Sequence, residues 1–115
     1  MRVWEPVPGL QPTLSSIQAN VFSIDCAVSG CHSGAAAPFG LDLGAGLAYG
    51  NLVNVASPRN AGLVRVVPGD PKNSLIIQKL SGKQTLGDQM PLGGPYLPQS
   101  TIDVICQWIA SGAPQ

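Results

Sequence analysis

The stretch CAVSGCH at residues 26–32 is the most informative part of this chain. It holds two of the three cysteines and the only histidine among the 115 residues. Four residues separate the two thiols, and the imidazole follows the second thiol directly. Gly30, within this bridge, lets the backbone bulge outward at little steric cost. The soft sulfur donors and the imidazole nitrogen are thus concentrated in one short segment.

Two closely spaced thiols followed at once by a histidine form the arrangement to which haem c is attached. The thiols of Cys26 and Cys31 can form thioethers with the two vinyl groups on one edge of the macrocycle. His32 is thereby carried beneath the iron, where its ring nitrogen serves as the proximal ligand. The usual arrangement has two residues between the cysteines, so the four found here make the pattern less specific.

Two other interpretations of these residues stay open. Cys26 and Cys31 can form a structural disulfide, which leaves His32 without a special role. Alternatively, these three residues and Cys106 can make a Cys3His zinc site. Cys106, however, lies in an apolar segment without the second short-spaced ligand pair that such sites usually have. It is more simply explained as a small buried hydrophobic residue.

A six-coordinate haem iron needs a second axial ligand, and the sequence offers one candidate. No second histidine exists, and apart from Met1 the only methionine is Met90, in the segment DQMPLGGP at residues 88–95. Pro91 restricts the backbone beside it. Ligation by His32 and Met90 would raise the reduction potential relative to two histidines. Methionine is also a common filler of core gaps, so that simpler role remains open.

The composition excludes several classes of protein. Charged residues make up 10% of the chain and the formal net charge is zero, which argues against nucleic-acid binding because that needs basic clusters. No apolar run reaches the roughly 20 residues needed to span a bilayer. The 44% hydrophobic content argues against disorder. We expect an arm or linker over residues 1–11 and a single domain over residues 12–115.

Apolar spacing and capping signals predict three or four short helices joined by long loops rich in Gly and Pro, and no convincing sheet. The apolar run at residues 63–67 is too short to assign. The expected helices cover residues 13 to about 24, part of 47–55, 70 to about 80, and 100–112.

Three of these helices carry recognisable end signals. Pro12 and Thr13 are the expected start of the first helix. Asp70 is the expected N-cap of the third helix, with Pro71 at its first position. Ser100 and Asp103 resemble a capping box at the start of the last helix, with Asp in place of the usual Glu. Gly112 is expected to end that helix.

Several motifs in order give the chain a resemblance to a known family. From residue 17 to residue 113 it resembles a small single-haem c-type cytochrome domain found in exported bacterial proteins. The order of the motifs is far more specific than any one of them. The matching pieces are CHSG at 31–34, GLDL at 40–43, PGDPKNSL at 68–75, MP at 90–91 and WIASGA at 108–113.

The resemblance implies an all-α, cytochrome c-like fold, in which the N- and C-terminal helices cross over one haem. By position, Cys26 and Cys31 would bind haem c covalently, His32 would be the proximal ligand and Met90 the distal ligand. The four-residue bridge departs from the commoner family pattern. This departure concerns the thioether geometry more than the identity of the ligands.

Other side chains are candidates for contact with the haem. Arg65 can pair with a propionate, although a solvated surface role is an equal alternative. Trp108 and Tyr96 can pack on the ring or donate to a propionate, and Trp108 is equally a core residue. The expected pocket walls are Phe22, Leu41, Ile76, Leu80, Leu92 and Ile105.

These observations predict a one-electron carrier that exchanges electrons with redox partner proteins and is not itself an enzyme, although it can also be an accessory domain of an oxidoreductase. Covalent haem attachment places it in the periplasm or outside the cell, as an exported chain whose signal peptide is not in this sequence. The low charge also favours self-association. The alternatives are a haem domain with an open distal site for ligand sensing or peroxidase chemistry, and an interaction domain held by a disulfide or zinc.

Overall fold

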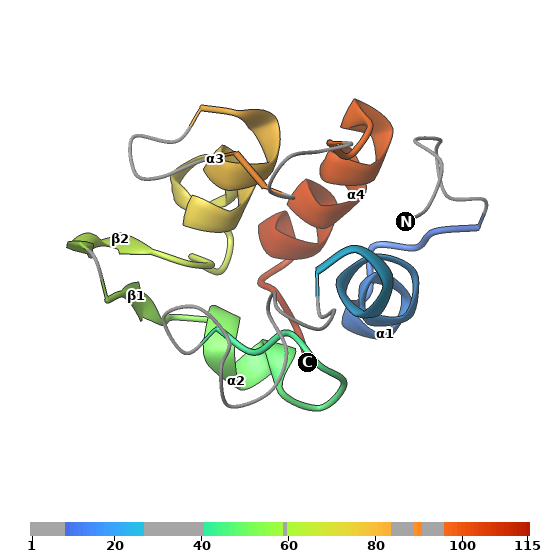
Figure 1. Cartoon of the computed structure of the whole chain (residues 1–115), viewed down its shortest axis with the longest axis horizontal. Coiled ribbons are helices and arrows are strands. Elements are labelled where there is room, and N and C mark those ends of the chain that lie inside the picture. Colours follow the sequence, from blue (N-terminus) through green and yellow to red (C-terminus); the bar gives the residue numbers. More distant parts are fainter. Residues whose placement is uncertain (1–8, 27–40, 59, 84–88, 91–95) are drawn as a thin grey trace.

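A computed structural model describes residues 9–26, 41–58, 60–83, 89–90 and 96–115. Cys31, His32 and Leu92 therefore lie outside the described residues, as does most of the expected N-terminal arm. Figure 1 shows several short helices grouped together, with a small β-hairpin at one edge. The elements in chain order are α1 (Leu14–Ile17), η1 (Gln18–Cys26), α2 (Ala48–Leu52), β1 (Ala56–Ser57), β2 (Asn60–Val64), η3 (Pro71–Asn73), α3 (Leu75–Ser81) and α4 (Gln99–Ala110).

The first helical segment begins where the sequence predicts. Thr13 is the N-cap, and its hydroxyl accepts a hydrogen bond from the backbone N–H of Ser16 at 3.3 Å. The segment starts as one α-helical turn, α1, and continues without a gap as the π-helix η1 as far as Cys26. The predicted helix is thus confirmed in position. Its winding was not predicted, because π-helices are rare and usually limited to a single turn.

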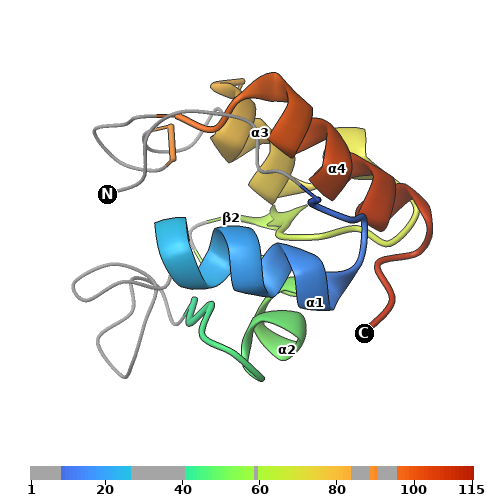
Figure 2. The same ribbon diagram turned by 90° about the vertical axis from the view of Figure 1, so that its right-hand side faces the viewer.

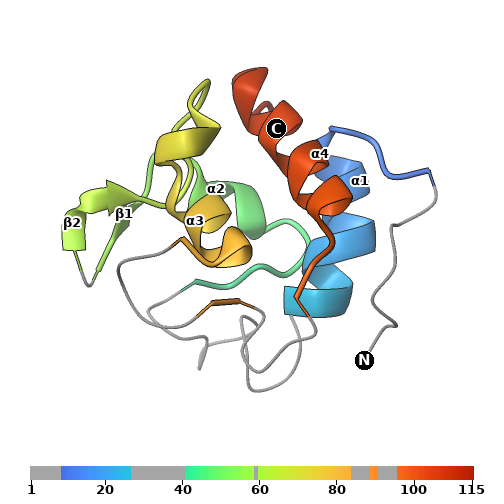
Figure 3. The same cartoon turned by 90° about the horizontal axis from the view of Figure 1, so that it is seen from above.

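The β-hairpin corrects the prediction that the chain has no sheet. β1 and β2 pair antiparallel, with Ala56 opposite Val64 and Ser57 opposite Asn60. A two-residue strand is too short to show the alternation of apolar and polar residues by which strands are recognised. The hairpin lies on the side of the molecule away from α1 (Figures 1 and 3).

The third predicted helix is split in two. Asp70 is its N-cap, as expected, and accepts hydrogen bonds from the backbone N–H of Asn73 at 3.4 Å and from its side-chain amide at 2.7 Å. The chain then forms a 3₁₀ turn, η3, before α3 begins. The break is at buried Ser74, whose hydroxyl donates to the Asp70 carbonyl at 2.9 Å and accepts from the Val67 N–H at 2.8 Å. These bonds hold Ser74 in an extended conformation between the two helices.

The last helix, α4, begins slightly earlier than predicted. Its N-cap is Pro98 and not Ser100, because the Pro98 carbonyl already accepts from the N–H groups of Thr101 and Ile102, at 3.0 and 3.2 Å. Asp103 accepts from the Gln99 side chain at 2.9 Å, so no capping box forms. The predicted end is confirmed: Gly112 follows the C-cap residue with φ +106° and donates to the carbonyl of Ile109.

The helices share one hydrophobic core. α4 runs between α3 and the α1/η1 segment (Figures 1 and 3) and lies above that segment, tilted relative to it, in Figure 2. The buried residues that we call the core cluster are Ile17, Val21, Phe22, Leu43, Ala48, Leu52, Val66, Leu80, Leu97, Ile102, Ile105, Trp108, Ile109 and Ala113.

Within the described residues, no helix is long and apolar enough to cross a membrane.

Candidate functional site

The π-helix η1 determines where Cys26 lies. Ile17, Val21 and Phe22 are fully buried, and Cys26 is half-buried against the same core cluster. Their spacing of four, one and four residues matches a helix of about 4.4 residues per turn, in which each hydrogen bond spans five residues. One face of this helix therefore carries all three core residues and the cysteine.

An α-helix over the same residues would place Cys26 elsewhere. Cys26 is nine residues after Ile17, which is about two turns of a π-helix. In an α-helix, with about 3.6 residues per turn, it would be about two and a half turns, on the opposite face. The π winding thus places the Cys26 thiol at the edge of the core.

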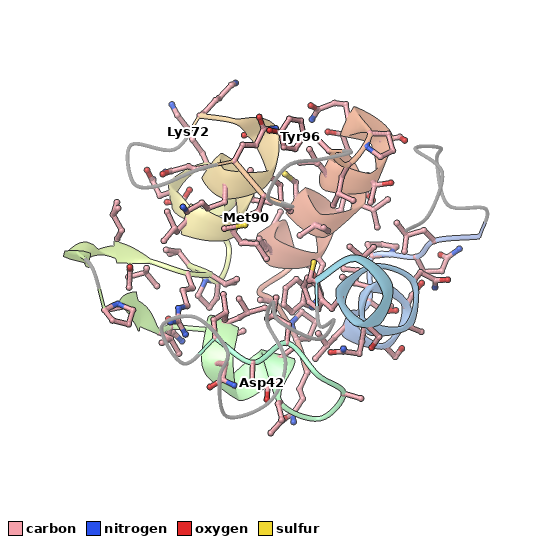
Figure 4. All side chains as sticks on the ribbon, viewed as in Figure 1. Asp42, Lys72, Met90 and Tyr96 are labelled. Atoms are coloured by element: carbon pink, nitrogen blue, oxygen red, sulfur yellow. The ribbon has the colours of Figure 1, made fainter. Side chains whose placement is uncertain are left out.

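Met90 reaches the same core from another part of the chain. Its backbone N–H donates to the Lys79 carbonyl at 2.9 Å, and the side-chain amide of Gln89 donates to the Leu80 carbonyl at 3.0 Å. These bonds attach the segment to the end of α3. The Met90 side chain is half-buried and packs against the core cluster. It lies toward the middle of the molecule in Figure 4.

Gly82 lies directly beside the side chain of Gln89. It ends α3 with φ +76°, a conformation that favours glycine. A Cβ at this position would lie 2.7 Å from the side-chain oxygen of Gln89. Any other residue would therefore be strained in this conformation and would displace the side-chain amide of Gln89 from its present position.

Arg65 is buried and not solvated. Only 6% of its surface is exposed, and its guanidinium donates to the Asn51 carbonyl at 2.9 Å. Burial lowers the pKa of this guanidinium because it disfavours the charged form. The structure thus excludes the surface role. The contact with a propionate stays a prediction.

The two aromatic candidates differ in their surroundings. Trp108 is fully buried in the core cluster, and its indole N–H donates to the Pro114 carbonyl at 2.8 Å. Trp108 is therefore a core residue whose single donor is already engaged. Tyr96 is 37% exposed and precedes α4, where Figure 4 shows it at the edge of the molecule.

Most of the expected pocket walls contact the core cluster. Phe22, Leu80 and Ile105 belong to it, whereas Leu41 and Ile76 are partly buried against it. Leu92 lies outside the described residues.

Cys106 is a free thiol on α4, half-buried against the core cluster. Burial, and then the nearby Asp103 carboxylate, raise the pKa of its thiol. This agrees with its interpretation as a small hydrophobic residue. The described residues contain no group of three or more His, Cys, Asp or Glu side chains that could hold a metal ion. The zinc hypothesis also needs Cys31 and His32, which are not among them.

Thr101 was not predicted from the sequence. It is 1% exposed on α4, and its hydroxyl has no hydrogen-bond partner within the described structure. It lies four residues before Ile105 and seven before Trp108, on the helix face that is turned to the core. A buried hydroxyl without a hydrogen-bond partner lowers the free energy of unfolding by about 1–3 kcal/mol. A polar group that bonded to this hydroxyl would remove that loss.

The described residues include side chains of the types that a haem would need. The group is a large apolar disc with two carboxylates and an iron that accepts sulfur and nitrogen ligands. The structure offers thiol and thioether sulfurs beside one apolar core, in Cys26 and Met90, together with a buried guanidinium and an unmet buried hydroxyl. The π spacing and the partnerless hydroxyl are the two features that sequence reasoning missed. The spacing of Ile17, Val21, Phe22 and Cys26 could have revealed the first, whereas nothing in the sequence marks the second.

Comparison of the chain with protein-family models, with curated proteins and with solved structures finds no match in any of the three.

Proposed function

We propose that the protein is a mono-haem c-type cytochrome that carries one electron at a time between redox partner proteins. In this proposal Cys26 and Cys31 hold haem c covalently, and His32 and Met90 bind its iron. The protein acts as a carrier and not as an enzyme. It is exported to the periplasm or the cell exterior, where such attachment takes place.

The observation that carries the proposal is the position of Cys26 and Met90. These residues are far apart in the sequence, yet both side chains pack against one core cluster. Cys26 begins the attachment motif, and Met90 would supply a thioether ligand to the iron. Two separate segments of the protein thus each place a sulfur atom beside one apolar core.

The chain's own residues have three tasks in this function. The helix η1 orients Cys26, and the end of α3 holds the backbone of Met90. Arg65 and Thr101 offer a buried cation and a buried hydroxyl to the carboxylates of the group. The haem supplies the one-electron iron chemistry, while the ligands and the burial set its potential.

The intact mass of the protein tests this proposal. The chain is produced in cells that attach haem c and is analysed by mass spectrometry, and by haem staining after denaturing electrophoresis. We expect the mass of the polypeptide plus one haem, and a stained band. A Cys26→Ser, Cys31→Ser variant is the matched control and should lose the stain. An unstained wild-type band with the mass of the polypeptide alone would overturn the proposal in favour of a disulfide or zinc domain.

The distal ligand is tested separately. A Met90→Ala variant should keep its covalent haem and lose the low-spin ferric spectrum, because a thioether–iron bond is removed. Ile77→Ala, at another side chain that packs against the core cluster, is the matched control and should leave the spectrum unchanged. A high-spin spectrum in the wild-type protein would instead support a haem domain with an open distal site.

A further inference from the structure

Residues 14–26 contain two overlapping apolar patterns. Spacings of three, four and three residues would bring one set to a single face of an α-helix. That set is Leu14, Ile17, Val21 and Ile24. The structure has a π-helix from residue 18, and the four residues whose spacing matches it contact the core cluster. These are Ile17, Val21, Phe22 and Cys26. The apolar pattern alone therefore does not select the π winding.

The two windings also bury similar amounts of apolar surface. Ile17 and Val21 belong to both patterns. The π winding adds Phe22 and Cys26, whereas an α winding would add Ile24. Burial of a Phe and of an Ile side chain contributes similarly to stability, and the α-helix is by far the commoner winding. A polar contact that forms in only one of the windings can therefore decide between them.

Both hydrogens of the Gln18 side-chain amide are engaged in such contacts. The nitrogen donates to the Ser23 hydroxyl at 2.9 Å and to the Leu43 carbonyl at 2.8 Å. An amide nitrogen has only two hydrogens to donate. Leu43 is a buried residue of the core cluster in the segment before α2. The bond to Leu43 thus fixes the amide while its other hydrogen points to Ser23.

The bond between Gln18 and Ser23 requires the π winding. Five residues separate the two side chains, which is a little more than one turn of a π-helix, so both lie on nearly the same side. In an α-helix the same five residues turn the chain about 140° beyond one full turn, and the two side chains point apart. An α winding would therefore break this bond.

We propose that Gln18 is the positioning residue that selects the π winding of η1 and so holds Cys26 at the edge of the core for the attachment of haem c. The inference rests on the proposed function. In the attachment, the sulfur and the hydrogen of the thiol add across one vinyl double bond, so nothing is oxidised or reduced and no group leaves. Gln18 takes no part in this step and acts only through the place of the thiol.

The first test measures the winding and does not depend on haem. NMR couplings across hydrogen bonds, recorded on the reduced full chain, identify the carbonyl to which each N–H of η1 donates. We expect carbonyls five residues back in the wild type. In Gln18→Leu, bonds to carbonyls four residues back should appear, because the loss of one winding-specific hydrogen bond raises the ratio of α to π winding about fivefold. Gln107→Leu, the same change at an exposed residue of α4, is the matched control and should leave η1 unchanged.

Ser23→Ala distinguishes the loss of this bond from a general loss of stability. Ser23 is exposed, so the variant should fold even if Gln18→Leu does not. It removes the same bond from the other side, and we again expect a change of about fivefold. The double variant should change the winding no further, because the two residues act as one pair. Ser15→Ala, at an exposed serine of α1, is the matched control.

The second test measures the attachment of Cys26. The variants are made in a Cys106→Ala background and produced in cells that attach haem c. The protein is then unfolded and treated with iodoacetamide, and its mass is measured. We expect Gln18→Leu and Ser23→Ala to raise about fivefold the fraction that carries one haem and one alkylated thiol. Peptide analysis should place that thiol at Cys26.

Three results would overturn the inference. One is a wild-type protein in which the N–H groups of η1 bond four residues back, and another is an unchanged winding in Ser23→Ala. The third is a changed winding with no increase in unattached Cys26. A wild-type chain with the mass of the polypeptide alone would refute the proposed function, and the couplings would still decide whether Gln18 selects the π winding.

Discussion

The first and last helical segments both pack an apolar face against the core cluster, but they differ in the number of residues per turn. Each buries an apolar stripe in the core cluster and has a cysteine at the edge of that stripe, Cys26 in η1 and Cys106 in α4. In α4 the buried residues Ile102, Ile105 and Ile109 are three and four residues apart, as in an α-helix. In the first segment Ile17, Val21, Phe22 and Cys26 require the wider π turn.

The difference shows that the number of residues per turn of each helix matches the spacing of the residues that face the core. An α-helix at η1 would turn Cys26 away from the interior, whereas the π-helix keeps it there at the expense of less favourable hydrogen bonding. α4 needs no such compromise. We therefore expect the two segments to respond differently to changes in length, in side-chain volume and in cysteine chemistry.

The largest effect is expected from deleting single residues. Removing exposed Gln107 from α4 turns the residues that follow by about 100°, so Trp108 and Ile109 leave the core and the protein unfolds. Removing exposed Ala19 and Ser23 from η1 should be tolerated, because the stripe then has the three, one and three spacing of an α-helix. Circular dichroism and haem staining measure both outcomes. Equal loss of structure in the two variants would contradict the π interpretation.

The next largest effect concerns the aromatic residue of α4. Trp108→Ala removes a fully buried side chain and its hydrogen bond to the Pro114 carbonyl. We expect it to lower the free energy of unfolding by about 4 kcal/mol, measured by urea denaturation. The neighbouring Gln107→Ala is the matched control and should change stability by no more than about 0.5 kcal/mol, as surface substitutions do. A small effect of Trp108→Ala would show that this helix is not central to the core.

The same contrast explains how much of the fold was predictable. The signals at Thr13, Asp70 and Gly112 were read correctly because each acts within its own turn of the chain. The break at Ser74 was missed because it depends on a bond to Val67, seven residues away. The N-cap of α4 was wrongly predicted at Ser100, because the carbonyl of Pro98 accepts the first helical hydrogen bonds. Signals that act within one turn could be predicted from the sequence, whereas contacts between segments could not.

The candidate site follows the same rule. Residue type and order drew attention to Cys26 and Met90, since thiols and thioethers are scarce in this chain. The burial of Arg65 and the unmet hydroxyl of Thr101 are properties of the packed core, so the sequence did not reveal them. The cytochrome c-like fold and the roles of Cys31 and His32 stay predictions.

A smaller effect is expected at Thr101 on α4. If the Thr101 hydroxyl donates to the proposed haem, Thr101→Val in the haem-loaded protein should lower the free energy of unfolding by about 1 kcal/mol and shift the reduction potential. Thr101→Ser retains the hydroxyl and is the matched control. If the valine variant is instead more stable, the hydroxyl remains without a partner in the loaded protein and does not contact the haem.

The smallest effect is expected in the pH dependence of stability, to which Cys26 and Cys106 should contribute differently. Burial and Asp103 raise the pKa of Cys106 above the 9.0 of a free thiol, so the folded protein keeps a proton that the unfolded chain has lost. Stability from this group is therefore complete below about pH 8 and is lost as the pH rises through the folded pKa. Urea denaturation between about pH 7 and pH 10 should show this decline. Cys106→Ala should remove that part of it, whereas Cys26 adds none if its sulfur is a thioether. An unchanged alkaline decline in Cys106→Ala would show that another group titrates, and the thiol of α4 would then have no part in the pH dependence of stability.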